Sequence, residues 1–261
     1  MKLCARTSVI ASLSGLLSLM VAMPPSWANT IGEPIASARS SDTDTLRQGL
    51  PGRRLGGGTR GNRIFSQNHG SLVALTTPDP LSITTAERPA LLFYVPEMVS
   101  ANTAEFVLRD RDDQLIYITT FEIDSIGGII RIEPTSDELS ALALNENYQW
   151  YFSLIPDGQD RASDIVVHGS IRRVEQTEWL SQQPVGTALA QQLTTATPLA
   201  RAKLLYQQAN LWHDAALILQ PLRQSYPENT AIAAEWAQLL KFADLAAVVP
   251  VSQPLVQISR N

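Results

Sequence analysis

The stretch Tyr148-Gln149-Trp150-Tyr151-Phe152-Ser153-Leu154 decides the fold class, because an apolar or aromatic side chain stands at every second position. In an extended chain its even-numbered residues share one face, while Gln149 and Ser153 lie on the other. Alternation with a period of two is typical of an antiparallel strand with one buried face. The stretch therefore predicts a β-strand that turns an aromatic face toward a core.

Similar alternation recurs between residues 71 and 175. The further predicted strands contain Val73-Leu75, Leu91-Phe93-Val95, Phe106-Leu108, Leu115-Ile123, Ile130-Ile132 and Ile165-Ile171. About seven strands in roughly 105 residues is the density expected of a β-sandwich. Asp112-Asp113 is predicted to form a hairpin tip. Leu144 stands four residues before Tyr148, and Trp150 lies on the same face as Tyr148. This arrangement resembles the tyrosine-corner strand of immunoglobulin and fibronectin type III domains. We predict an antiparallel β-sandwich of this kind over residues 66–180.

Residues 198–242 change to helical spacing, and Pro198 suits the first turn of a helix. The spacing from Tyr206 onward resembles a tetratricopeptide repeat, although Pro221 is expected to interrupt its second helix. The residues that carry this likeness are Tyr206, Trp212, Ala215, Leu219, Leu222 and Pro227. Such repeats need about three units to bury a continuous core. We therefore predict a small helical hairpin over residues 185–245, docked on the sandwich, and no peptide-binding solenoid.

The N-terminus has the features of a secretory signal peptide. Lys2 and Arg6 precede an apolar run over residues 9–22, and small residues at Ser26 and Ala28 form a cleavage site. Cleavage after Ala28 would remove residues 1–28. No apolar run long enough to cross a membrane follows, so we expect an exported protein of the periplasm or extracellular space with no transmembrane segment after processing.

Composition excludes several kinds of chemistry. The only cysteine, Cys4, lies in the predicted signal peptide, so the processed chain would contain no thiol for nucleophilic, metal or redox chemistry. The formal net charge is -5, and residues 71–180 carry 18 acidic against seven basic side chains. Because nucleic-acid binding needs a basic surface, no nucleic-acid partner is expected.

Residues 29–65 are rich in glycine, serine and arginine and predict a flexible basic leader. Gly56, Gly58 and Gly61 fit the G-x-G-x-x-G spacing of dinucleotide-binding proteins. That motif needs a strand before it and a helix after it, and the flanking sequence predicts neither. We therefore predict no cofactor and assign this run to a turn or to a backbone nest that packs on the domain edge. Residues 246–261 are predicted to be a C-terminal tail.

Candidate chemistry concentrates in one acidic loop, residues 157–164, after the aromatic strand. Its candidate interaction or ion-binding residues are Asp157, Asp160, Arg161 and Asp164. Paired carboxylates can hydrolyse a glycosidic bond or bind an ion. The alternative is an Asp-Gly turn in which Arg161 bridges carboxylates and holds the loop. The three histidines lack metal-ligand spacing, so we predict isolated surface positions for them and no metal site.

Several motifs together resemble a family of exported cyanobacterial proteins called domain of unknown function 928, and the likeness spans roughly residues 53 to 245. The motifs are Arg53-Arg54-Leu55-Gly56-Gly57-Gly58-Thr59-Arg60-Gly61, Thr85-Ala86-Glu87-Arg88-Pro89, Phe93-Tyr94-Val95-Pro96, Tyr148 to Leu154, Asp160-Arg161 to Asp164, Ile171-Arg172-Arg173-Val174 and Trp212-His213-Asp214-Ala215. The resemblance implies an exported protein and supplies no activity.

These observations favour a non-enzymatic interaction or structural module of the envelope, with an envelope protein or a glycan as its partner. The alternative is an exported glycan hydrolase, or an ion- or ligand-binding protein, that uses the loop 157–164.

Overall fold

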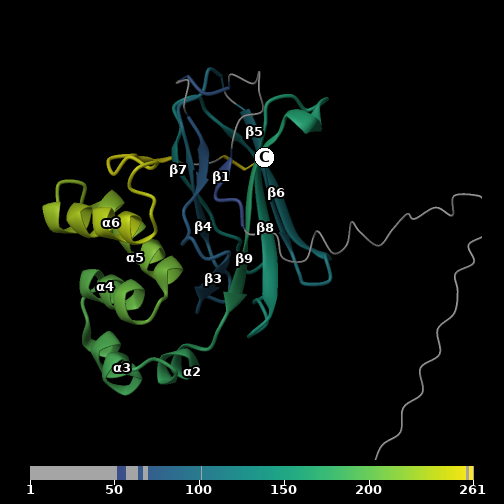
Figure 1. The fold of residues 1–261 in the computed structure, drawn as a ribbon. Helices are drawn as coiled ribbons and strands as arrows, with labels where there is room; N and C mark the ends of the chain where they lie inside the picture. Colours follow the sequence, from purple (N-terminus) through teal and green to yellow (C-terminus); the bar gives the residue numbers. More distant parts are fainter. Residues whose placement is uncertain (1–51, 57–63, 67–69, 101, 257–258, 261) are drawn as a thin grey trace, which may run out of the picture. The chain divides into compact units, whose positions relative to one another are not determined.

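The computed structural model describes residues 52–56, 64–66, 70–100, 102–256 and 259–260, which form two β-sheets and five α-helices (Figure 1). In spatial order, the first sheet contains β1 (Leu55–Gly56), β2 (Leu72–Ala74), β4 (Leu91–Val95), β7 (Gly128–Ile132) and β10 (Leu255–Val256). The second contains β11 (Ser259–Arg260), β6 (Leu115–Ile123), β5 (Asn102–Arg109), β8 (Asn147–Ile155), β9 (Ile165–Arg173) and β3 (Leu81–Thr84). Neighbouring strands are antiparallel except in the pairs β10–β7 and β3–β9. Each predicted strand overlaps one of these strands.

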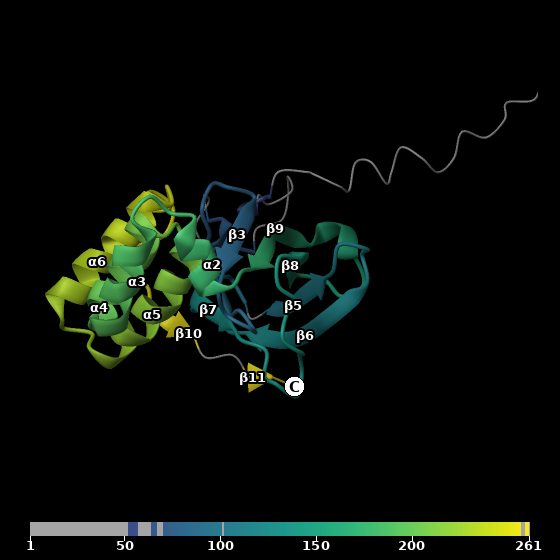
Figure 2. The ribbon, with the colours of Figure 1, turned by 90° about the horizontal axis from the view of Figure 1, so that it is seen from below.

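The two sheets face each other across an apolar core (Figure 2). Phe93 of β4 stacks on Phe152 of β8 with ring centroids 4.3 Å apart, and the ring of Trp150 meets Phe93 edge-on at 5.6 Å. The even-numbered residues of β8 are all buried, as their alternation predicts. The aromatic face of β8 therefore lies at the centre of the core.

The hairpin between β5 and β6 turns where the sequence predicts. The backbone N–H of Asp110 donates to the carbonyl of Gln114 at 3.0 Å, and the Asp110 carboxylate accepts from the Gln114 N–H at 2.8 Å. Asp113 adopts a left-handed backbone with φ of 61°, which an aspartate tolerates better than most residues. The predicted Asp112-Asp113 tip is confirmed.

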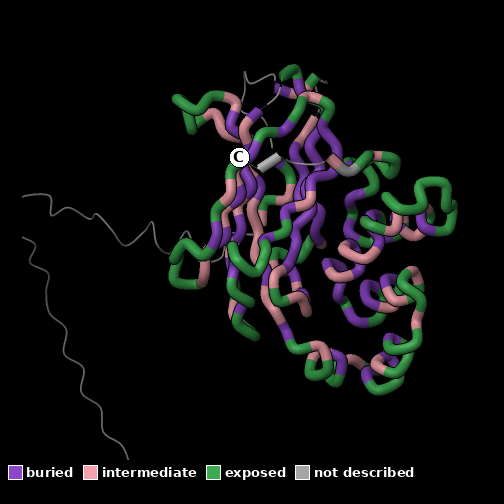
Figure 3. The backbone as a smooth tube through the Cα atoms, turned by 180° about the vertical axis from the view of Figure 1, so that it is seen from behind, coloured by how far each residue is buried: buried purple, intermediate pink, exposed green. Residues whose placement is uncertain are grey.

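Helices cover the other face of the first sheet. Strand β4 is buried at all five positions, because Leu91, Phe93 and Val95 belong to the core between the sheets while Leu92 and Tyr94 pack against helices. Figure 3 shows the buried positions continuing from the strands to the helices that lie against them. A strand covered on both faces loses the simple alternation of a half-buried one.

The helical region contains more helices than the predicted hairpin. It consists of α2 (Gln176–Ser181), α3 (Gly186–Thr195), α4 (Pro198–Gln208), α5 (Trp212–Ser225) and α6 (Thr230–Phe242). Helix α2 buries one residue, Leu180, and α3 buries Gly186, Leu189 and Leu193. Such sparse apolar positions give a weak helical pattern, so α2 lies outside the predicted helical region 185–245, and α3 lies within it without being predicted as a separate helix.

Two prolines of the helical region occupy different positions in their helices. Pro198 occupies the first turn of α4 behind the N-cap Thr197, as predicted. Pro221, expected to interrupt a helix, lies inside α5, which continues to Ser225. Burial of the helix before the proline, at Leu219 and Gln220 among others, compensates for the backbone hydrogen bond that a proline cannot make.

Parts of the predicted leader and tail join the sheets. Strand β1 pairs with β2, and Phe65 forms a bridge with Met98. A Cβ on Gly56 would lie 2.9 Å from Cγ2 of Ile165, so the strand can approach the core here only because glycine has no side chain. The tail adds β10 and β11, one to each sheet. The predicted signal peptide, residues 1–28, and residues 29–51 and 57–63 of the leader lie outside the described residues. Among the described residues, no helix has the length and apolar character needed to cross a membrane.

Candidate functional site

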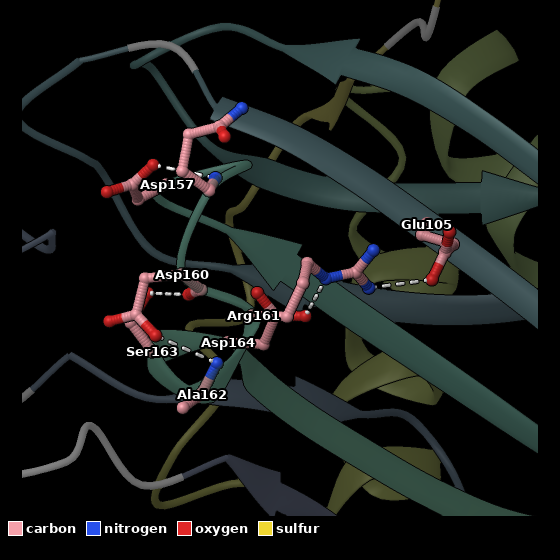
Figure 4. Close-up of polar contacts among 8 residues, drawn as sticks. Glu105, Asp157, Asp160, Arg161, Ala162, Ser163 and Asp164 are labelled. Atoms are coloured by element: carbon pink, nitrogen blue, oxygen red, sulfur yellow. Dashed lines mark hydrogen bonds and ion pairs between the residues drawn. The ribbon is translucent and has the colours of Figure 1, made fainter.

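The acidic loop 157–164 begins with a side chain-stabilised turn (Figure 4). Oδ1 of Asp157 accepts a hydrogen bond from the backbone N–H of Gln159 at 2.9 Å, and the N–H of Asp160 donates to the Asp157 carbonyl at 3.1 Å. This is the local turn that an aspartate followed by a glycine favours. The Asp157 carboxylate therefore serves the turn.

Asp160 caps the short 3₁₀ helix η1 (Arg161–Ser163). Its Oδ1 accepts from the backbone N–H of Ala162 at 3.2 Å, and its carbonyl accepts from the hydroxyl of Ser163 at 2.7 Å. A carboxylate at this position satisfies a backbone donor that the helix leaves open. Both polar groups of Asp160 thus act within the loop.

Arg161 connects the loop to strand β5. Its Nε donates to Oδ2 of Asp164 at 2.7 Å, and its Nη2 donates to Oε1 of Glu105 at 2.8 Å (Figure 4). The hydrogen bonds to Glu105 and Asp164 raise the pKa of Arg161. The guanidinium bridges two carboxylates, as the alternative interpretation of this loop requires.

One atom of the loop is not explained by this bridge. The Asp164 side chain is 8% exposed, and its Oδ1 is buried without a hydrogen-bond partner. An unpaired buried carboxylate oxygen is unfavourable and is compatible with a further donor or cation. Within the described part of the chain, however, no group of three or more His, Cys, Asp or Glu side chains is placed to hold a metal ion.

The histidines differ from their predicted surface positions. His213, at the start of α5, is 5% exposed, and its Nε2 has no hydrogen-bond partner. Burial lowers the pKa of His213. His168 is half-buried beside Tyr151, with ring centroids 5.8 Å apart, and its pKa is lowered by burial and by Arg53. His69 lies outside the described residues. The prediction was wrong for His213 because a histidine beside an aspartate at a helix start carries no signal of its depth in the sequence.

Asp214 fastens the start of α5 to the end of β3. Its carboxylate accepts from the hydroxyl of Thr84 at 2.5 Å, and from the backbone N–H and the hydroxyl of Thr85 at 2.9 and 2.7 Å. Three donors on one carboxylate make a charge-assisted junction between a helix and a strand 130 residues apart in sequence.

Two arginines of the sequence motifs hold other junctions. Nη1 of Arg54 donates to the carbonyls of Thr76 and Ala243 at 2.8 and 2.7 Å, which joins the end of β2 to the C-terminus of α6. Arg173 donates to the carbonyl of Leu142 at 2.8 Å and pairs with Glu87 at 3.2 Å. These charged side chains connect segments that are distant in sequence.

Two cavities lie elsewhere, and neither is lined by a residue of the loop 157–164. One, of about 450 Å³, lies between the connection from β2 to β3 and the start of α5, with Trp179 of α2 and Phe242 at the end of α6 in its wall. The other, of about 670 Å³, lies among α5, α6 and residues 251–254. Neither cavity could be predicted from the sequence, because their walls come from segments that only the fold brings together.

Comparison with known proteins gives a family and no activity. No curated protein matches the chain. A family described as Domain of Unknown Function (DUF928) matches residues 55–253, which is more than half of the chain. The matched range contains both sheets' central strands and all five described helices. The chain belongs to the family of the domain of unknown function 928.

Proposed function

We propose that the chain is an exported envelope protein that acts by binding a partner and catalyses no reaction of its own. Export is supported by the basic start, the apolar run over residues 9–22 and the cleavage site after Ala28. The expected partner is an envelope protein or a glycan in the periplasm or extracellular space.

We also propose that the two sheets form a sandwich of the immunoglobulin/fibronectin type. The hydroxyl of Tyr148, the second residue of β8, accepts a hydrogen bond from the backbone N–H of Ala143 at 3.0 Å. A tyrosine near the start of a strand that bonds to backbone a few residues upstream is the arrangement of a tyrosine corner.

Helices α4 and α5 are proposed to be a tetratricopeptide-like pair that serves as a platform on the sandwich. They bury Tyr206, Trp212 and Leu219 in one core, together with residues of the first sheet. These are positions at which the sequence resembles the repeat.

The main support for the proposal is that charged side chains of the sequence motifs form structural contacts. Arg54, Arg161, Arg173 and Asp214 each form contacts that hold distant segments together. A catalytic constellation needs a nucleophile, an acid or a base that is free to meet a substrate. Side chains that are occupied in structural contacts favour a scaffold whose surface does the binding.

A capture experiment tests the binding role. The chain from Asn29 onward serves as bait in cross-linked envelope fractions and, separately, with purified envelope polysaccharide. An unrelated exported protein of similar size and charge is the control. We expect specific recovery of a protein or a glycan, and recovery of the bait alone in both arms would contradict the proposal.

A separate experiment tests export. Fractionation followed by N-terminal sequencing is expected to find a chain that begins at Asn29 outside the cytoplasm. An uncleaved chain in the cytoplasm would refute this part of the proposal without affecting the binding role.

The buried, unpaired Oδ1 of Asp164 favours one alternative, in which the loop 157–164 binds an ion or acts in an exported glycan hydrolase. Calcium added to millimolar concentration should then raise the melting temperature, and the increase should disappear in Asp164→Asn. For a hydrolase, Asp160→Asn and Asp164→Asn should abolish turnover of an envelope glycan. Unchanged melting and unchanged turnover would exclude this role of the loop.

A further inference from the structure

The cavity of about 670 Å³ lies between the C-terminal half of α5, the turn 226–229, the start of α6 and the segment 251–254. Ile129 of β7 contributes to its wall. In Figures 1 and 2, the chain that follows α6 returns past the helices to place β10 beside β7. Three parts of the chain that are far apart in sequence thus form this cavity, whose size is that of a small-molecule site.

Arg223 provides the positive charge of the cavity. Its Nη2 donates to the carbonyls of Val251 and Gln253 at 2.6 and 3.3 Å, and its guanidinium lies 4.7 Å from the ring centroid of Trp236. These contacts fix the side chain in place. Among the residues that the structure describes, no aspartate or glutamate forms an ion pair with Arg223.

The absence of an acidic partner distinguishes Arg223 from Arg161 and Arg173, each of which meets a carboxylate. Arg223 is also partly buried, and burial lowers its pKa. The N–H groups of Arg223 that do not meet the carbonyls of Val251 and Gln253 favour an anionic ligand, because a carboxylate accepts a charge-assisted hydrogen bond from a guanidinium.

Two amide side chains add neutral donors. Gln220 is 4% exposed, and its Oε1 accepts from Arg131 at 3.3 Å, so its amide nitrogen is the group left for a ligand. Oδ1 of Asn229 caps α6 by accepting from the N–H groups of Ala231 and Ile232, which likewise leaves its amide nitrogen. Amide N–H groups of this kind suit hydroxyl oxygens.

An aromatic ring completes the site. Tyr226 lines the cavity and is 58% exposed, which leaves much of its side chain accessible to a ligand. Ile129, Ile232 and Pro254 supply apolar wall. A sugar ring combines a weakly apolar face with hydroxyl groups at its edge, and such a face suits an amphipathic aromatic side chain.

We propose that this cavity binds a carboxylated sugar of the uronic acid class, with the carboxylate on Arg223, hydroxyl groups on the amides of Gln220 and Asn229, and the ring against Tyr226. The site goes beyond the proposed function, because a capture experiment can succeed through a protein partner while this cavity binds nothing. It is also separate from the loop 157–164.

Calorimetric titration of the purified chain tests the proposal, with sodium D-glucuronate as the probe and D-glucose as its neutral match at one ionic strength. We expect glucuronate to bind at least about tenfold more tightly than glucose, which is the effect of a single charge-assisted contact. A trisaccharide of galacturonate distinguishes a polysaccharide ligand from a free sugar acid. A site for a polysaccharide should bind the trisaccharide more tightly than the monomer. Equal binding of glucuronate and glucose, or no binding of glucuronate, would overturn the proposal.

Variants assign the binding to the cavity. Arg223→Gln should weaken glucuronate at least about tenfold and leave glucose almost unchanged. Lys241→Gln, which removes an equal charge from an exposed position of α6 that does not line the cavity, is the matched control and should bind as the parent does.

A melting curve shows whether Arg223→Gln folds, since Arg223 also holds residues 251 and 253. If it does not, Tyr226→Ala tests the same site, because the exposed Tyr226 side chain contributes little to the core. It should weaken both glucuronate and glucose. Unchanged affinity in a folded Arg223→Gln, or in Tyr226→Ala, would show that glucuronate binds elsewhere.

Discussion

Substitution of Gly169 by alanine tests the packing at the centre of the sandwich. Gly169 of β9 pairs with Trp150 of β8. A Cβ at this position would lie 2.5 Å from Cζ2 of Trp150, 3.0 Å from Cε2 and 3.2 Å from Cη2. Because these distances are below van der Waals contact, either the indole or the backbone of β9 must move. Trp150 is 1% exposed and meets Phe93 edge-on at 5.6 Å, so its ring has little room.

Two opposing effects set the magnitude. Overpacking of a well-packed core costs about 1–3 kcal/mol. Alanine also restricts the unfolded chain, which favours the folded state by about 0.4–1 kcal/mol where the backbone is compatible. Gly169 is compatible, since its φ is not positive. The net effect should be a loss of about 1–2 kcal/mol of unfolding free energy, or roughly 2–8 °C in melting temperature for a domain of this size.

Urea unfolding of paired variants measures this loss. Gly158→Ala is the matched control, because a Cβ on Gly158 meets no atom within 4 Å and its φ is not positive. Its unfolding free energy should equal that of the parent or exceed it by up to about 1 kcal/mol, because alanine restricts the unfolded chain here without a clash. In a Trp150→Phe background the smaller ring leaves space, so Gly169→Ala should cost about 1 kcal/mol less than in the parent. If Gly169→Ala is as stable as Gly158→Ala, or equally destabilising in both backgrounds, the contact with Trp150 is not the cause.

Three further predictions concern the helical layer. Asp214→Asn should lower the free energy of unfolding in urea by about 1.5–3 kcal/mol, since it removes the charge that accepts from Thr84 and Thr85, while Asp157→Asn in its exposed turn should change it little. The lowered pKa of buried His213 means that the unfolded state binds more protons, so stability should fall as the pH drops below about 6.5, and His213→Gln should reduce that dependence in urea titrations at each pH. Burial and the hydrogen bond to Glu235 raise the pKa of Tyr206 to about 12, so an alkaline absorbance titration should show a late phenol transition that Tyr206→Phe removes. An unfolding free energy that does not change between pH 5 and 7 would contradict the prediction for His213. A late phenol transition that persists in Tyr206→Phe would contradict the prediction for Tyr206.

The sandwich strands could be predicted because their signal is local. In β8, alternation alone identifies the buried side chains, since one face meets the core and the other does not. Strand β4 shows the limit of this signal. Its five consecutive buried residues identify a strand, but only the structure shows that Leu92 and Tyr94 belong to a second core with the helices. The two-residue strands β1, β10 and β11 are too short for any pattern.

The helices could be predicted only where apolar residues are dense. The buried positions of α5 and α6 recur at helical spacing, and both helices fall within the predicted region. Helices α2 and α3 expose most of their surface, so they resemble polar connections in sequence. The N-cap Glu175, whose carboxylate accepts from the N–H of Glu178 at 2.7 Å, marks the start of α2. Glutamate is not among the residues that usually mark an N-cap, so the sequence gives no clear signal for the start of this helix.

The acidic loop shows why a candidate site is harder to predict than a strand. The sequence places Arg161 beside Asp160 and Asp164, but its partner Glu105 lies 56 residues away on β5. A carboxylate is free for chemistry only if no cation reaches it, and this depends on the fold. Whether a cation is available for a ligand also depends on the fold, and Arg223 looks like an ordinary helix-terminal arginine in the sequence. It becomes a candidate for binding because the fold surrounds it with carbonyls, an indole ring and a cavity, and no carboxylate of the described residues pairs with it. Arg223, which forms no ion pair among the described residues, therefore indicates a binding site more directly than the acidic loop 157–164 does.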